Sequence, residues 1–214
     1  MNTDSDQLFH SSGWIDPSTL KFVDDLRLHL PIINKEMSLM LQKHYFDAHC
    51  LGFGPRNWLA QEFDIREMSS CVENWIREGG FHSDQIGYDS RKYGEWRTLP
   101  LFKSDIPETQ LLMQRYLPQT LNLLARIPNL WFSAFFNQPV GAEIAEHRHV
   151  PNRRIFHLLM NPLQDGHAWI QVSGEKRTIE NSGDCLAFDV RYPHSSGNAS
   201  SSDRVNLVLE ILAS

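Results

Sequence analysis

The stretch CLAFDVRYPHSSGNASSSDRVNLVLEIL, residues 185–212, decides the fold class. It holds two runs rich in apolar and β-branched residues, CLAFDV and RVNLVLEIL, on either side of a serine- and glycine-rich segment from Ser195 to Ser202. Runs of the first kind are typical of strands, and segments of the second kind are typical of turns. The stretch therefore predicts two short strands with a turn region between them.

The same pattern extends upstream as far as Pro128. Further β-like runs follow one another there, separated by turn signals rich in proline, glycine, serine and asparagine. In chain order these runs are LWFSAFF, AEIAEH, RRIFHLLM, HAWIQV and KRTIEN. About seven short strands spaced by turns predict a β-sandwich or a barrel.

The chain ahead of this region has mainly helical periodicity, with charged residues between the apolar positions. We therefore predict an α+β protein with a single domain over residues 1–214. Residues 1–128 would form a mainly helical supporting layer, and residues 129–214 would form the core of a β-barrel. The expected elements are helices at Pro17–Gln42 with a break at Pro31, Trp58–Gly79, and Glu108–Ile127 with a kink or boundary at Pro118, and one or two strands within Ile86–Phe102.

Composition limits the classes of partner. Hydrophobic residues make up 41% and charged residues 21% of the 214, as in soluble globular proteins. The net charge of −6 argues against nucleic acid and anionic membranes as partners, because both need a basic face. The N-terminal residues lack the features of a signal peptide, no apolar run is long enough to span a membrane, and the three cysteines suit free thiols. A cytoplasmic location is therefore expected.

Histidines supply the chemistry that the predicted barrel would position. His147 and His149 lie two residues apart and would share one face of a strand, and His194 follows 47 residues after His147. Neutral imidazoles suit iron, zinc and copper, and a pair on one strand with a third on another is a common way to build an open site. The sequence therefore predicts a metal centre within residues 129–214.

Four motifs surround these histidines in a fixed order. They are Gly141–x5–His147, the arginine-rich run NRRIFHL at residues 152–158, Gly183–x5–Asp189–x4–His194, and Arg204 ten residues after the second histidine. With these motifs, the chain from about Asn129 to Leu212 resembles the aspartyl/asparaginyl β-hydroxylase family of iron(II)- and 2-oxoglutarate-dependent oxygenases. The resemblance implies a double-stranded β-helix, which is a jelly-roll or cupin-like barrel, supported by the N-terminal helices.

The resemblance also implies roles for individual residues. His147 and His194 would be the metal ligands and the catalytic centre, with Fe(II), 2-oxoglutarate and O2 bound there. Arg204 would pair with the distal carboxylate of 2-oxoglutarate, because a planar guanidinium matches a carboxylate bidentately. His157 would contact the proximal carboxylate, and Arg153 would hold an acidic group of the substrate. Asp189 would support the turn that carries His194.

Two departures from the family pattern affect this site. His149 stands where many oxygenases of this broad fold place a carboxylate ligand. A third-ligand role is open for it, but we expect it to support the site from outside the metal's ligand set or to face the substrate, because the HRH turn at residues 147–149 has a cationic character. Ile155 stands where the family has an arginine, and Arg154 could take that role through a β-bulge.

The implied function is hydroxylation of an unactivated C–H bond in a small amino-acid-like or acidic substrate, or in a carrier-bound conjugate of one. Desaturation and halogenation use related chemistry and stay open. A cupin-type dioxygenase or isomerase without 2-oxoglutarate is the alternative enzyme, because Gly141–x5–His147–x–His149 also resembles a cupin motif. A metal-dependent sensor or a sugar-binding barrel is the non-enzymatic alternative.

Overall fold

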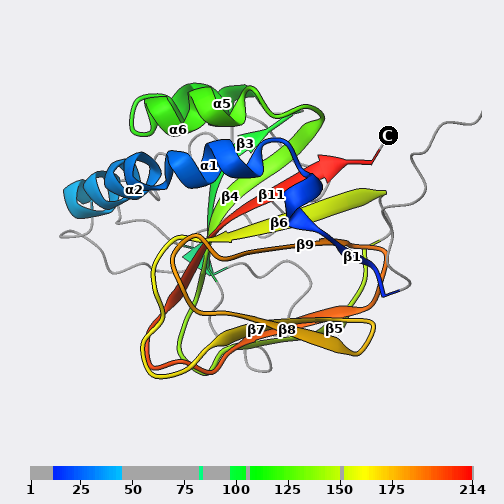
Figure 1. Ribbon diagram of the computed structural model, residues 1–214. Helices are drawn as coiled ribbons and strands as arrows, with labels where there is room; N and C mark the ends of the chain where they lie inside the picture. The colour runs from blue at the N-terminus through cyan, green and yellow to red at the C-terminus, as the bar shows by residue number, and fades with distance from the viewer. Residues whose placement is uncertain (1–11, 45–81, 84–96, 105–106, 150–151, 214) are drawn as a thin grey trace, which may run out of the picture.

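The computed structural model describes residues 12–44, 82–83, 97–104, 107–149 and 152–213. The helix predicted over Trp58–Gly79 lies outside these residues. Within them, two antiparallel sheets face each other, and helices cover the outer face of the larger sheet (Figure 1). No helix in the described ranges has both the length and the apolar character that crossing a membrane requires.

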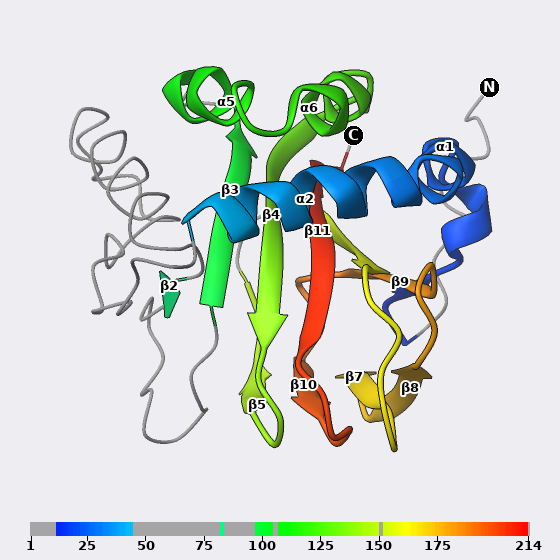
Figure 2. The same cartoon turned by 90° about the vertical axis from the view of Figure 1, so that its left-hand side faces the viewer.

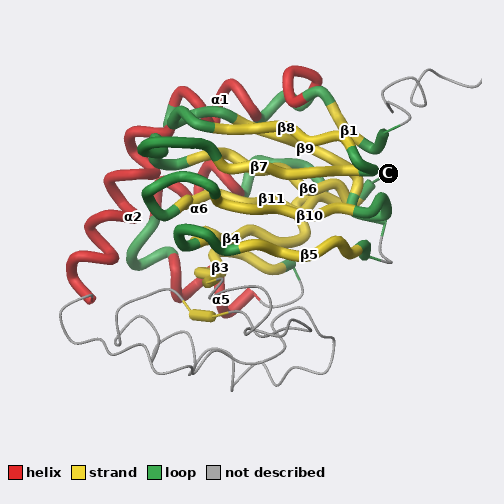
Figure 3. The backbone as a smooth tube through the Cα atoms, turned by 90° about the horizontal axis from the view of Figure 1, so that it is seen from below, coloured by secondary structure: helices red, strands yellow, loops and turns green. Residues whose placement is uncertain are grey.

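The larger sheet has seven strands and the smaller has four. The major sheet holds, in spatial order, β1 (Trp14–Ile15), β9 (Cys185–Asp189), β6 (Arg153–Leu159), β11 (Arg204–Leu212), β4 (Leu130–Gln138), β3 (Arg97–Lys103) and β2 (His82–Ser83). The minor sheet, which Figure 3 shows from its outer side, holds β5 (Glu143–His147), β10 (His194–Asn198), β7 (Ala168–Val172) and β8 (Glu175–Ile179). From β4 to β11 the chain crosses repeatedly between the two sheets, and only β7 and β8 follow each other within one sheet. This arrangement is the predicted jelly-roll barrel with supporting helices.

The helical layer differs from the prediction in where its helices end. Figure 2 shows the helices along the outer face of the major sheet. The predicted break at Pro31 falls instead at His29, and Pro31 lies in the first turn of the following helix, where proline costs no hydrogen bond. Pro118 separates two helices as predicted. The elements are η1 (Pro17–Thr19), α1 (Val23–Leu28), α2 (Leu30–His44), α5 (Pro107–Met113) and α6 (Pro118–Leu124).

Alternation along the central strands divides the apolar residues between two cores. On β6, Phe156 and Leu158 pack toward the helices, whereas Ile155 and Leu159 pack inside the barrel against the minor sheet. On β11, Leu207 and Leu209 face the helices and Val208 faces inward. Since side chains alternate strictly along a strand, residues 153, 157, 204 and 206 also belong to the inward face. The pattern therefore directs polar side chains of β6 and β11 into the barrel.

Strand β10 was missed by the sequence analysis, which assigned Ser195–Ser202 to a turn. The strand is paired on both edges, with β5 on one side and β7 on the other. Gly197 lies against Trp169, and a Cβ atom at this position would come within 2.5–2.6 Å of the indole ring. The small residues that weaken the strand signal are therefore the ones that let Trp169 pack across β10.

Glu36 of α2 caps the beginning of α6. Leu117, at the N-cap position, offers no side-chain acceptor. Instead, the buried carboxylate of Glu36 accepts hydrogen bonds from the backbone N–H of Gln119 at 2.9 Å and from the N–H and hydroxyl of Thr120 at 2.9 and 2.7 Å. Glu36 thus satisfies two N–H groups that no residue within α6 can satisfy.

Glu36→Ala should lower the free energy of unfolding by roughly 2–4 kcal/mol, because buried N–H groups would lose their charged acceptor. Urea unfolding followed by circular dichroism measures this change. Lys35→Ala is the matched control, since Lys35 is exposed on the same helix, and it should cost less than about 0.5 kcal/mol. Equal stability of the two variants would contradict the capping role.

Candidate metal centre

His147 and His194 form a cross-strand pair at the rim of the minor sheet. His147 is the last residue of β5 and His194 is the first residue of β10, and the antiparallel register sets them opposite each other. Their ring centroids lie 4.2 Å apart. Pairing of these two strands therefore brings together two histidines that are far apart in sequence.

His194 was expected in an exposed turn, and this expectation was wrong. It belongs to strand β10, is only 6% exposed, and packs against the ring of Phe188 with a centroid distance of 4.9 Å. The strand assignment failed because the residues after His194 have turn-like composition. His194 consequently contributes to packing as well as to the histidine cluster.

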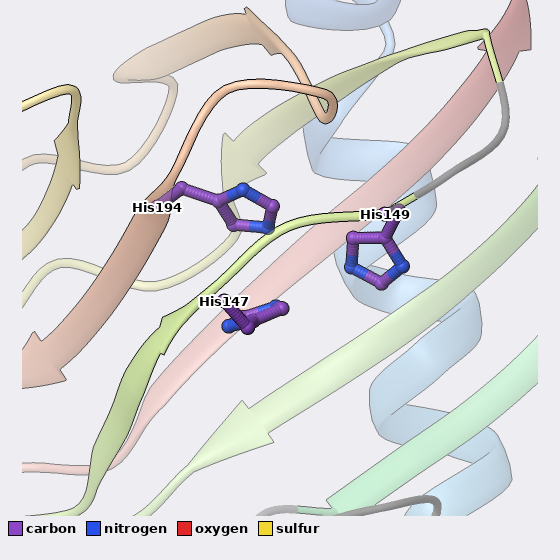
Figure 4. Close-up of side chains that lie close together, drawn as sticks. All are labelled: His147, His149 and His194. Atoms are coloured by element: carbon purple, nitrogen blue, oxygen red, sulfur yellow. The ribbon is translucent and has the colours of Figure 1, made fainter.

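His149 completes the cluster from just beyond the end of β5. Its backbone N–H donates to the carbonyl of Val190 at 2.9 Å, which ties the segment after β5 to the end of β9. Its ring lies 5.1 Å from that of His147 and 5.3 Å from that of His194, and Figure 4 shows the three rings around a common space. One ring nitrogen from each histidine lies within 4.8 Å of the other two.

Backbone carbonyls orient the paired rings. Nδ1 of His147 lies 2.8 Å from the carbonyl oxygen of Ala145, and Nδ1 of His194 lies 2.8 Å from that of Tyr192. A carbonyl only accepts, so each Nδ1 carries the proton and each Nε2 keeps a lone pair. A hydrogen bond of this kind on the far nitrogen is the usual support of a metal-ligating histidine.

The cluster favours uncharged imidazoles. Burial, followed by the neighbouring His147, lowers the pKa of His194 to about 3. Burial, followed by the charges of His147 and Arg153, lowers the pKa of His149 to about 4. Burial also lowers the pKa of His147. Neutral nitrogen donors in this number and at this spacing fit a first-row transition-metal ion such as iron(II).

Arg204 lies on the inward face of the same barrel, at the first position of β11. It is only 4% exposed, and burial lowers its pKa to about 10, so it remains a cation at neutral pH. Nη1 donates to Oε1 of Gln138 at 2.8 Å. The amide oxygen of Asn206, when turned toward the guanidinium, accepts from Nη2 at 2.7 Å and from Nε at 3.1 Å. In the opposite orientation, the NH2 group of the Asn206 amide would face the N–H groups of the Arg204 guanidinium, so that donors would face donors.

His157 lies between Arg204 and the histidine cluster. Its Nδ1 is 3.1 Å from the Asn206 amide, and its ring stacks on Phe188, which also contacts His194. Burial, and then the charges of Arg204 and His194, hold the pKa of His157 well below its usual value. Arg204 Nη2 lies 3.5 Å from Nδ1 of His157, and Phe188 contacts both His157 and His194, so the cluster and the buried arginine share one interior.

A comparison with known families decides the classification. The profile of the aspartyl/asparaginyl β-hydroxylase family matches residues 62–213. The chain belongs to this family. The resemblance drawn from its motifs is thus confirmed, and the protein is a hydroxylase-family member with a cupin-like barrel.

Other comparisons are weaker. No curated protein matches the chain. Among solved structures, a predicted oxalate decarboxylase from Thermotoga maritima is 18% identical, with 56% of this chain and 83% of that chain covered and a TM-score of 0.39. A cupin superfamily protein from Desulfitobacterium hafniense is 12% identical, with 56% and 81% covered and a TM-score of 0.36. Salicylate 1,2-dioxygenase from Pseudoaminobacter salicylatoxidans is 16% identical, with 40% and 21% covered and a TM-score of 0.32.

Arg153 lies on the inward face of β6, and its backbone carbonyl accepts from the N–H of Val190, whose own carbonyl accepts from His149. Its Nη1 forms a 2.8 Å ion pair with the largely buried Glu210, and its guanidinium carbon lies 3.3 Å from the ring centroid of Trp131. Its charge contributes to the lowered pKa of His149. In this hydroxylase-family member, the predicted substrate arginine therefore lies beside the histidine cluster and is already paired with a carboxylate.

Arg154 was suggested as a substitute for the family's missing arginine, and the structure contradicts this idea. Strand β6 keeps a regular register with both β9 and β11, so no bulge turns Arg154 inward. Its side chain lines a cavity on the helical side of the sheet, together with Phe22 and Phe156. Strict alternation along β6 keeps it on the opposite face from His157.

Asp189 shapes the turn that leads to His194, which is the role expected for it. Its fully buried carboxylate accepts hydrogen bonds from the backbone N–H and the guanidinium of Arg191. These bonds fix the turn after β9, in which Val190 accepts from His149 and Tyr192 orients His194. Asp189 thus shapes the backbone that holds two of the histidines.

Three neighbours of the predicted residues were missed. Asn206 and Glu210 follow Arg204 by two and six residues, so the period of a strand would have placed them on its face. Gln138 had no such signal, because the register between β4 and β11 cannot be read from the sequence.

Proposed function

We propose that this hydroxylase-family protein is an iron(II)- and 2-oxoglutarate-dependent dioxygenase. One observation carries the proposal: a buried arginine shares a barrel interior with a cluster of neutral histidines. Among the described residues, no carboxylate forms an ion pair with Arg204. A buried cation needs an anionic partner, and its contacts to Gln138 and Asn206 leave guanidinium N–H groups available. The distal carboxylate of 2-oxoglutarate fits this position.

The ligands of the iron would be His147 and His194. Both Nδ1 atoms are bound to backbone carbonyls, so the lone pair that each ring would offer to the ion is on Nε2. When bound, iron would bring 2-oxoglutarate and O2 together and supply the oxidising power for hydroxylation, with succinate and carbon dioxide as products. His157, beside Arg204, would contact the proximal end of 2-oxoglutarate and help to exclude water from the barrel.

The substrate would approach from the side of Arg153. The pair formed by Arg153 and Glu210 presents a cation and a carboxylate on the inward face of the barrel, and the backbone of Arg153 is linked through Val190 to that of His149. Such a pair complements a molecule that carries both charges, as an amino-acid group does, and Trp131 adds an aromatic surface. We therefore propose a small amino-acid-like or acidic substrate, or a carrier-bound conjugate of one, acted on in the cytoplasm.

A spectrophotometric titration under nitrogen tests this function. Iron(II) and 2-oxoglutarate together should produce a weak visible charge-transfer band that neither produces alone. Admission of air should then release succinate, most rapidly with the correct substrate in a screen of amino acids, peptides and acyl-carrier conjugates. Metal binding that is unaffected by 2-oxoglutarate would instead indicate a cupin-type enzyme. An absence of metal binding would indicate a non-enzymatic barrel.

A further inference from the structure

We propose that His149 is a third ligand of the metal ion, so that the centre has three histidines. The proposal rests on the proposed function only in taking His147 and His194 as ligands. Each histidine offers a ring nitrogen within 4.8 Å of the other two. Two imidazole nitrogens bound to one ion lie roughly 3–4 Å apart, because each metal–nitrogen bond is about 2.0–2.1 Å long. Small ring rotations would therefore bring all three nitrogens to one ion.

The backbone of His149 is fixed in this position. Its N–H donates to Val190, and the N–H of Val190 donates to the carbonyl of Arg153 at 3.2 Å. The carboxylate of Asp189 holds the adjoining turn through Arg191. Ligands held by such supporting contacts need little reorganisation when a metal binds.

The sequence argument for a different role does not hold in the structure. It gave the HRH turn a cationic character, which would suit an anionic substrate better than a metal ion. Arg148, however, is exposed, whereas His147 and His149 on either side of it are partly buried and adjacent to each other. The charged side chain of Arg148 therefore lies at the surface, whereas the ring of His149 lies within the histidine cluster.

A third histidine determines which other ligands the metal accepts. If three histidines held the ion, fewer of its coordination positions would remain for small molecules than with two histidines. A centre with two histidines would keep a further position, open to water or to an exogenous anion such as chloride. The three-histidine centre would thus favour hydroxylation over halogen transfer, because it has one position fewer for a halide.

Equilibrium titration with cobalt(II) in the absence of 2-oxoglutarate tests this ligand set. The proteins to compare are wild type, His149→Gly, His149→Asp and the exposed control Arg148→Ala. His149→Gly should bind the metal more than about 100-fold less tightly, a larger loss than supporting residues usually cause. His149→Asp should recover much of the affinity through an oxygen ligand, and Arg148→Ala should bind as the wild type does.

X-ray absorption spectroscopy of the wild-type cobalt protein counts the coordinated imidazoles independently of the variants. A count of three supports the proposal, and a count of two overturns it even if the variants fail to fold. His149→Gly binding within tenfold of wild type would also overturn it. With 2-oxoglutarate also bound, chloride should alter the cobalt(II) spectrum of His149→Gly and leave that of wild type unchanged.

These outcomes separate this proposal from the proposed function. If the wild-type protein binds metal and responds to 2-oxoglutarate but coordinates only two imidazoles, the proposed oxygenase function is retained and the ligand role of His149 is rejected. If three imidazoles are coordinated and 2-oxoglutarate has no effect, the ligand role of His149 is retained and the proposed oxygenase function is rejected. If the wild-type protein binds no metal, both proposals are rejected.

Discussion

Replacing His194 with alanine is expected to abolish metal binding and succinate formation. The change removes one of the two ligands predicted from the sequence, whose ring lies 4.2 Å from that of His147 and 5.3 Å from that of His149. Iron(II) affinity, measured anaerobically by equilibrium titration, should fall below detection. Succinate release should then fall to the rate measured with free iron(II) in buffer without protein.

The same substitution should also cost some stability. The sequence analysis placed His194 in a turn, but it is buried in strand β10 against Phe188. The cavity left by the imidazole should lower the free energy of unfolding by roughly 1–3 kcal/mol. Circular dichroism and urea unfolding therefore accompany the titration, so that loss of metal is judged only on folded protein.

His167→Ala is the matched control for His194→Ala. His167 is partly exposed, immediately precedes β7, and lies outside the histidine cluster. This variant should retain the metal affinity and the succinate yield of wild type. Undiminished succinate release by folded His194→Ala would rule out the metal assignment for His194.

The sequence predicted the barrel and the convergence of its histidines, because both follow from period and spacing. His147 and His149 share a face through alternation, and the Gly183–x5–Asp189–x4–His194 element leads out of a predicted strand. What it did not predict depends on contacts between strands. Strand β10 has a serine- and glycine-rich sequence with weak strand propensity, and it is stabilised by pairing with two neighbours and by Trp169.

For Arg204 too, the position in the strand could be predicted from the sequence, whereas the contacts between strands could not. Its place at the opening of the last strand was readable from the sequence, and so was its likeness to a carboxylate-binding arginine. Its contact with Gln138 arises from the register between β11 and β4, which depends on the assembled sheet. The ion pair between Arg153 and Glu210 likewise needs β6 and β11 to be neighbours. Sequence alone therefore offered Arg153 as a free cation, whereas the fold gives it a carboxylate partner.

Arg204→Met should raise the apparent KM for 2-oxoglutarate by at least about 30-fold. Methionine keeps most of the side-chain length and removes the cation. A buried, charge-assisted bidentate contact is worth roughly 2–5 kcal/mol, and about 1.4 kcal/mol corresponds to a factor of ten. Steady-state kinetics with varied 2-oxoglutarate at saturating iron measures the change.

A general loss of structure must be distinguished from a specific defect at Arg204, because the guanidinium also contacts Gln138 and Asn206. Two measurements do so: metal affinity without 2-oxoglutarate, and kcat at saturating 2-oxoglutarate. Both should change far less than KM, since the three histidines are held by backbone contacts that do not involve Arg204. Arg204→Lys retains the charge without the planar fork, so its KM should lie between those of wild type and Arg204→Met. A rise in KM of only twofold in Arg204→Met would mean that this buried cation binds something other than 2-oxoglutarate.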